Sequence, residues 1–63
     1  MLYKKVTIWL LEGESIITQD YEKVSVTISG NYLILSVHNE ESTEVTTHVY
    51  DLKTVKNWRT YIN

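Results

Sequence analysis

Apolar and polar residues alternate with a period of two along most of this chain. That period predicts β-strands, because successive side chains of a strand point to opposite faces. In residues 6–11 the even-numbered positions are all aliphatic, while the odd-numbered positions include Trp9 and Leu11. We therefore expect a strand whose even positions face a core and whose second face is also apolar.

Four further segments are expected to be strands, three of them with the same alternation and one, residues 14–19, as the return strand of the first hairpin. Turn-forming residues separate them. Gly13 and Gly30 can adopt positive φ and favour tight hairpin turns. Asp20 and Tyr21 predict a short loop or a bulge, and the polar run NEEST predicts a hairpin loop. The four segments cover residues 14–19, 22–29, 32–39 and 44–51. Together with the first segment they predict a five-stranded antiparallel meander, since sequential strands joined by short turns usually pair.

The closing segment DLKTVKNWRTYIN allows two structures. A short C-terminal helix over residues 52–61 would present one apolar stripe and turn its basic residues outward. A 3₁₀ turn near residues 51–56 followed by a strand would end the chain as small SH3-like and Sm-like barrels end. Its many β-branched and aromatic residues are mediocre helix formers, so we favour the turn and strand. The expected fold is an all-β, small antiparallel meander or SH3- or Sm-like barrel of five to six strands, and the alternative is a five-stranded sheet with the helix.

Composition supports the all-β prediction and limits the size of the core. Val, Ile and Thr together make up 21 of the 63 residues, and the chain contains neither Ala nor Pro. Such a length predicts one domain, residues 1–63, which buries only about 60% of its unfolded surface, so association with a second copy would add burial. The apolar run VTIWLL is too short for a signal sequence or a membrane span, which predicts a cytoplasmic protein with no membrane partner.

The hydrophobic rhythm of three stretches resembles a group of known proteins. The stretches YKKVTIWLLEGESI, VSVTISGNYLILSV and THVYDLKTVKNWRTYI together cover nearly the whole chain. They resemble the short all-β orphan proteins of phages and mobile elements of Gram-positive bacteria, although they contain no diagnostic motif. Members with known roles tend to bind and modulate a host protein. The resemblance therefore implies a host-protein partner, and it assigns no functional residue.

The chain is rich in large aromatic residues for its size, with two Trp and five Tyr. Interfaces favour Trp and Tyr because these side chains bring a large contact area at a low cost in entropy. We therefore predict a small non-enzymatic interaction module that self-associates as a homo-oligomer and binds another protein. The predicted contact residues are Trp9, Leu11, Trp58, Arg59 and Tyr61.

A second hypothesis is a small barrel that binds single-stranded nucleic acid. Lys53, Lys56 and Arg59 lie beside Trp58 and Tyr61 in the sequence. Cations that contact phosphates and rings that stack on bases are the combination that such proteins use. The formal net charge of −2 argues against a general polyanion binder, so we favour a solvated basic edge.

Residues with catalytic or metal-binding chemistry are few. His38 and His48 would share a face if the loop between their strands were odd in length, but two histidines are too few ligands for a zinc site. The carboxylates flank turns, and no nucleophile motif or phosphate-binding loop is present. The sequence thus predicts no enzyme, no catalytic residue, no metal site and no cofactor.

Overall fold

The computed structural model of the protein describes residues 1–62 and has one antiparallel sheet. No helix occurs among these residues, so the all-β prediction is confirmed. The sheet has five strands in the order β4-β3-β2-β1-β5. The strands are β1 (Leu2–Glu12), β2 (Ser15–Ser29), β3 (Tyr32–His38), β4 (Val45–Asp51) and β5 (Val55–Tyr61).

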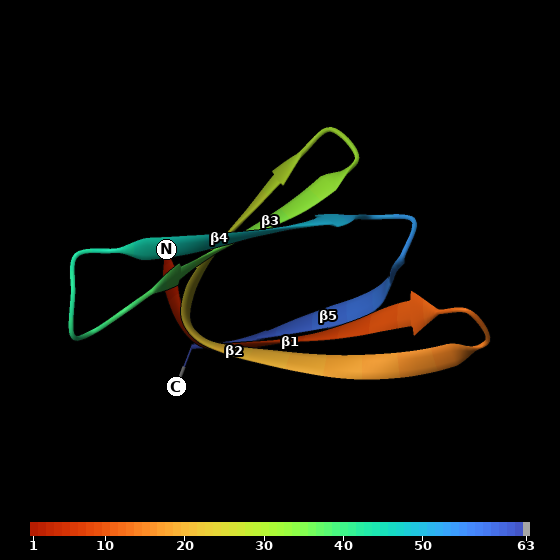
Figure 1. The fold of residues 1–63 in the computed structure, drawn as a ribbon, viewed down its shortest axis with the longest axis horizontal. Coiled ribbons are helices and arrows are strands. Elements are labelled where there is room, and N and C mark those ends of the chain that lie inside the picture. Colours follow the sequence, from red (N-terminus) through yellow and green to blue (C-terminus); the bar gives the residue numbers. More distant parts are fainter. Residues whose placement is uncertain (63) are drawn as a thin grey trace.

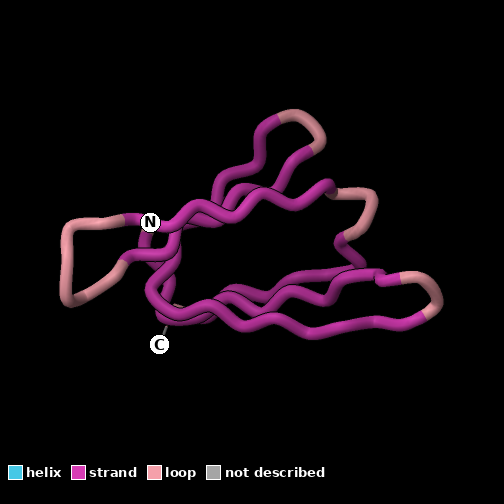
Figure 2. The backbone as a smooth tube through the Cα atoms, in the orientation of Figure 1, coloured by secondary structure: helices cyan, strands magenta, loops and turns pink. Residues whose placement is uncertain are grey.

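The sheet folds over on itself into two layers, and β2 belongs to both. The first part of β2 pairs with β1, and its last part, from Val24 to Ser29, pairs with β3. Figure 1 shows β2 curving from the lower layer, where it lies with β1 and β5, into the upper layer with β3 and β4. β4 and β5 are not hydrogen-bonded neighbours, so the sheet is not closed into a barrel (Figure 2).

The two layers meet at Lys23, where the side of β2 that faces the core changes. Tyr21 packs against the core, and so does Val24, although a regular strand would place these two side chains on opposite faces. Lys23, between them, has a φ of 53°, in the left-handed region that non-glycine residues rarely adopt. The expected irregularity at Asp20 and Tyr21 therefore lies at Lys23. β2 continues through it, so the sheet has five strands, within the five to six that the sequence predicts.

The core lies between the layers and is small. Val6, Ile8, Val24, Leu33 and Leu35 have no solvent-exposed surface. Burial of such a side chain contributes about 1.5–3 kcal/mol relative to an exposed one. The even-numbered positions of residues 6–11 are all buried, as the alternation predicts.

The closing segment is a turn and a strand, so the helix over residues 52–61 is wrong. In the turn, Thr54 N donates to Asp51 O at 2.9 Å and Val55 N donates to Leu52 O at 3.3 Å. β5 then pairs with β1, with a bulge that shifts the register between Trp9 and Leu10. The β-branched and aromatic residues of this segment fit a strand better than a helix, and the free edge of β1 supplies the hydrogen-bond partners that an isolated helix would have to form internally.

Main-chain bonds hold the closing turn against both layers. Leu52 N donates to Asn31 O at 2.8 Å, next to the β2–β3 hairpin, and Leu11 N donates to Thr54 O at 2.8 Å at the end of β1.

The described residues contain no helix that is long and apolar enough to cross a membrane.

Candidate interaction surface

One sheet face combines most of the predicted contact residues. It is the side of the β2–β1–β5 layer turned away from the core, and we call it the outer face. On β1 it carries the odd positions between Lys5 and Leu11, because the even positions are buried. The outer face also includes the residues that pair with these positions on β2 and β5. The outer face comprises Lys5, Thr7, Trp9, Leu11, Ile16, Thr18, Asp20, Glu22, Asn57, Arg59 and Tyr61.

The end of this face near the β1–β2 turn is apolar. Leu11 lies directly opposite Ile16, and Trp9 lies opposite Thr18. Leu11 is 42% exposed, Ile16 is 52% exposed, and Trp9 is half-buried. Neighbours on one face, including diagonal ones, lie within reach of an aromatic side chain. We call Trp9, Leu11 and Ile16 the apolar end of the outer face.

Ile16 is absent from the sequence-based predictions. The signal was present in the turn: Glu12 pairs with Ser15, so Gly13 and Glu14 form a two-residue loop. Such a loop fixes the register of the hairpin and places Ile16 across from Leu11. A two-residue loop at Gly13 and Glu14, combined with strand pairing, would have predicted that Ile16 lies beside Leu11.

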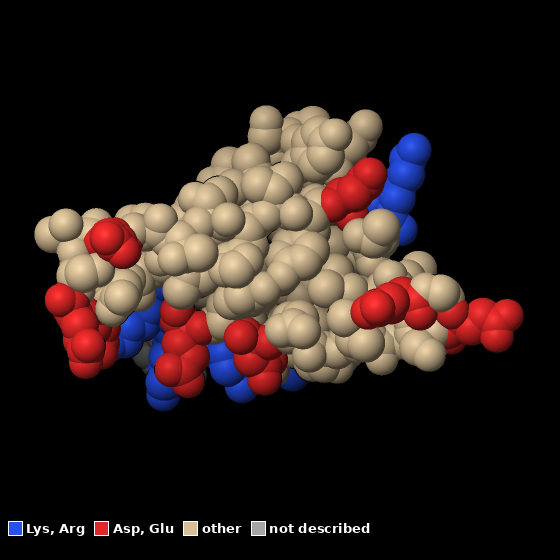
Figure 3. Space-filling view, viewed as in Figure 1, with Lys and Arg blue, Asp and Glu red and all other residues tan. Residues whose placement is uncertain are grey.

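The other end of the outer face is charged, with both signs close together. Thr7 is buried there and donates a hydrogen bond from Oγ1 to Asp20 Oδ1 at 2.6 Å. The Tyr61 ring lies under two cations, with Lys5 Nζ at 4.5 Å and the Arg59 guanidinium carbon at 4.9 Å from its centroid. Figure 3 shows acidic and basic groups interleaved along the lower margin of the molecule, whereas the middle of this view shows no charged group.

Trp58 does not belong to the outer face. It lies opposite Ile8, a fully buried residue, and packs against the core. The strand period separates it from Arg59 and Tyr61, so Trp58 lies on the opposite face from these two candidate contact residues. Trp9, Leu11, Arg59 and Tyr61 remain together on the outer face.

The three cations of the nucleic-acid hypothesis lie in different structural settings. Lys53 is in the turn after β4, where its N donates to Asp51 Oδ1 at 2.9 Å. Lys56 lies next to the bulge of β5, and Arg59 lies on Tyr61 in the outer face. Arg59 also faces Thr7, the hydrogen-bond partner of Asp20. The three cations thus lie in a turn, at a bulge and on the outer face, rather than in one row along a strand.

The two histidines lie on opposite faces of the β3–β4 pair, so the idea that they share a face is wrong. His38 pairs with Val45 in the register, which makes the loop between the strands even in length. His38 Nε2 lies 3.3 Å from Ser25 Oγ, whereas the His48 ring lies 4.7 Å from the Tyr21 ring on the core side. Among the described residues, no group of three or more His, Cys, Asp and Glu is placed to hold a metal ion.

Tyr21 also connects the two layers through a hydroxyl contact. Its hydroxyl group hydrogen-bonds the Tyr50 hydroxyl, so β2 of the lower layer is linked to β4 of the upper layer. Burial, together with this bond and the proximity of Tyr21, raises the pKa of Tyr50 from 10.0 to about 12. The neutral phenol is the form that the folded protein favours.

Comparison with known proteins gives no relative from which a function could be transferred. No family model matches the chain, and neither the curated proteins nor the solved structures contain a match.

Proposed function

We propose that this chain is a small non-enzymatic module that self-associates and binds another protein through its outer face. The observation that carries the proposal is the apolar end, where Leu11 and Ile16 stand exposed next to Trp9 on a sheet face. Exposed apolar patches on small soluble proteins often mark contact sites, and Trp is among the residues that contribute most to binding.

The charged end supports self-association. Asp20 and Glu22 lie on β2, while Lys5 lies on β1 and Arg59 on β5, so the two signs occupy different strands of one face. A two-fold interface brings one patch against itself, and a patch with both signs can then pair acid with base. The apolar end would supply the buried centre of such an interface.

We further propose that the fold is a small SH3-like barrel that is open between β4 and β5. Three features support this: a long bent β2 shared by both layers, a last strand that returns to β1, and a short turn between β4 and β5. We also propose that this turn is of the 3₁₀ type, which is supported by its two successive bonds from residue i+3 to residue i. The resemblance to phage and mobile-element proteins adds a host protein as the expected partner.

The test of self-association is a mass measurement in solution with a matched pair of variants. The wild type should scatter light as a dimer, twice the 7.4 kDa chain, at micromolar concentration. Leu11→Glu should yield a folded monomer, because it places a charge in the centre of the interface. Val49→Glu is the control, since Val49 is an exposed aliphatic residue on β4 in the other layer and should leave the dimer intact.

A wild type that remains a monomer would overturn the self-association. A dimer that Val49→Glu dissociates and Leu11→Glu does not would move the interface to the other layer. Binding of a protein partner has its own test: the partner captured from the native host by the wild type should be lost with Leu11→Glu and retained with Val49→Glu.

A further inference from the structure

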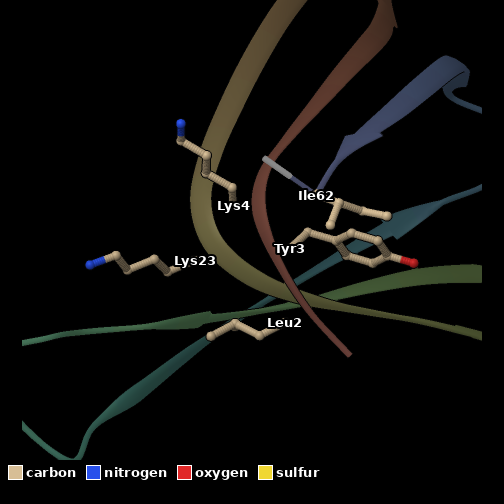
Figure 4. Close-up of a pocket in the computed structure, with 5 residues that line it drawn as sticks. All are labelled: Leu2, Tyr3, Lys4, Lys23 and Ile62. Atoms are coloured by element: carbon tan, nitrogen blue, oxygen red, sulfur yellow. The ribbon is translucent and has the colours of Figure 1, made fainter.

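A second feature lies away from the apolar end, where the start of β1 lies beside the end of β5. It is a shallow hollow of about 420 Å³ lined by residues from the start of β1, the corner of β2 and the end of the described chain. Figure 4 shows the Tyr3 ring beside the Ile62 side chain, with Leu2 nearby and Lys4 and Lys23 extending away from them. The volume falls within the range of small-ligand sites.

The apolar part of the hollow is open to solvent. Leu2 is 53% exposed and Ile62 is 62% exposed, although both are aliphatic. Tyr3 is partly buried, because it packs against the core. These three side chains offer an apolar surface on which a small apolar group could be desolvated.

Two features that cost folding free energy lie at this hollow: a pair of opposed lysines and a residue with positive φ. Pairing of β1 with β2 passes from Tyr3–Val24 to Lys5–Glu22, which leaves Lys4 across from Lys23. Like charges directly opposite each other on neighbouring strands destabilise a sheet. Lys23 also has a positive φ, a conformation that costs free energy for a residue with a Cβ atom and that often occurs at functional sites. An anion bound between these lysines would offset the repulsion.

Nearby carboxylates restrict where such an anion can bind. A smaller hollow of about 230 Å³ adjoins the first and shares Lys4, but Glu22 is part of its lining and disfavours an anion there. At the first hollow, Glu40 from the β3–β4 loop forms an ion pair with Lys23. Both side chains are well exposed, so the pair is weak and a bound anion can compete with it.

We infer that this hollow binds a carboxylate carried on an apolar group, with the carboxylate between Lys4 and Lys23 and the apolar group on Leu2, Tyr3 and Ile62. This ligand has two sources, the C-terminal residue of a protein and a free aliphatic carboxylic acid. The hollow lies next to the charged end of the outer face and away from the apolar end, and none of its lining residues belongs to the outer face. It can therefore be tested independently of the proposed interaction surface.

The experiment is an NMR titration of the ¹⁵N-labelled protein with two probes that differ only in charge. N-acetyl-leucine should shift the amide resonances of residues 2–4, 23 and 62, whereas N-acetyl-leucinamide, which lacks the carboxylate, should shift them far less. Lys4→Gln should weaken binding about two- to fivefold, as expected for one exposed ion pair. Glu40→Gln should strengthen it, since it removes the competing carboxylate.

Lys53→Gln is the control, because it removes a lysine from the distant turn and should not change the affinity. Equal shifts with both probes, shifts elsewhere on the sheet, or no shift at the solubility limit would overturn the inference. Octanoate and a peptide that ends in leucine distinguish the two sources, since the tighter of the two identifies the natural class. Leu11→Glu should bind N-acetyl-leucine as the wild type does, whatever its oligomeric state.

Discussion

Lys23 shows how one residue can set the relation between two layers. Its positive φ inserts a shift in the alternation of β2, so Tyr21 and Val24 both face the core. A straight strand would turn the apolar positions of its second half toward solvent. β2 can therefore take part in both layers only because the side that faces the core changes at Lys23. The left-handed conformation of Lys23 costs about 1–2 kcal/mol.

We predict that Lys23→Gly stabilises the protein by about 0.5–1 kcal/mol. Glycine adopts positive φ without the Cβ penalty, and this gain exceeds the loss from its greater freedom in the unfolded chain. The measurement is the midpoint of urea unfolding. Thr27→Gly, at an exposed position of the same strand with ordinary φ, should instead destabilise by about 1 kcal/mol.

A loss of stability in Lys23→Gly equal to that in Thr27→Gly would mean that position 23 has an ordinary extended backbone. The corner between the layers would then lie elsewhere on β2.

At the scale of elements, β5 packs against the core with one face and contributes to the outer face with the other. Trp58 packs against the core, opposite Ile8, while Arg59 and Tyr61 complete the charged end of the outer face. The short turn before β5 brings Leu52 and Val55 to the core as well. β5 thus covers one side of a core that β1 to β4 alone would leave open.

We predict that Trp58→Ala destabilises the protein by about 2–3 kcal/mol, somewhat less than a fully buried Trp would cost, because Trp58 is only half-buried. A chain of this length has about 3–9 kcal/mol of stability in total, so the variant should melt at a much lower temperature. Asn57→Ala, at the adjacent exposed position, should change stability by no more than about 0.5 kcal/mol.

If Trp58→Ala instead kept its melting temperature and lost only its association, Trp58 would face a partner rather than the core. Circular dichroism and light scattering on the same sample separate the two outcomes.

The sequence pattern predicted what depends on alternation within one strand and missed what depends on relations between strands. The core face of residues 6–11 followed from the even positions, and the closing strand followed from β propensity. β2 was predicted as two strands, because the polar residues near Asp20 break the hydrophobic pattern, although Thr7 and Asp20 continue the pairing. The sequence also left open whether His38 and His48 share a face and whether Trp58 points inward, because the loop length and the position of the core relative to each strand decide both.

At the scale of the whole molecule, several features besides the core hold the layers together. Among them are the bend of β2 at Lys23 and the hydrogen bond between Tyr21 and Tyr50 across the layers. Alternation within strands says nothing of this hydrogen bond, because it joins strands that are not neighbours in the sheet. It becomes possible only after β2 has bent.

We predict that this contact makes the protein sensitive to alkaline pH. The pKa of Tyr50 rises from 10.0 in the unfolded chain to about 12 in the folded protein, mainly through burial. Below pH 10 both states keep the proton and stability is unaffected. Between pH 10 and 12 the unfolded chain loses the proton while the folded protein keeps it, so the free energy of unfolding falls as pH rises.

At pH 11 the expected loss is about 1 kcal/mol, after allowance for the partial exposure of the phenol. Urea unfolding at pH 8 and pH 11 measures it, and Tyr50→Phe is the matched control, because it removes this titration and leaves the other tyrosines and the lysines. The difference between wild type and Tyr50→Phe should therefore shrink from pH 8 to pH 11. A difference that stays constant would mean that the pKa of the Tyr50 hydroxyl is the same in both states, and a difference that grows would mean that folding lowers this pKa. Either result would contradict the buried link between the layers.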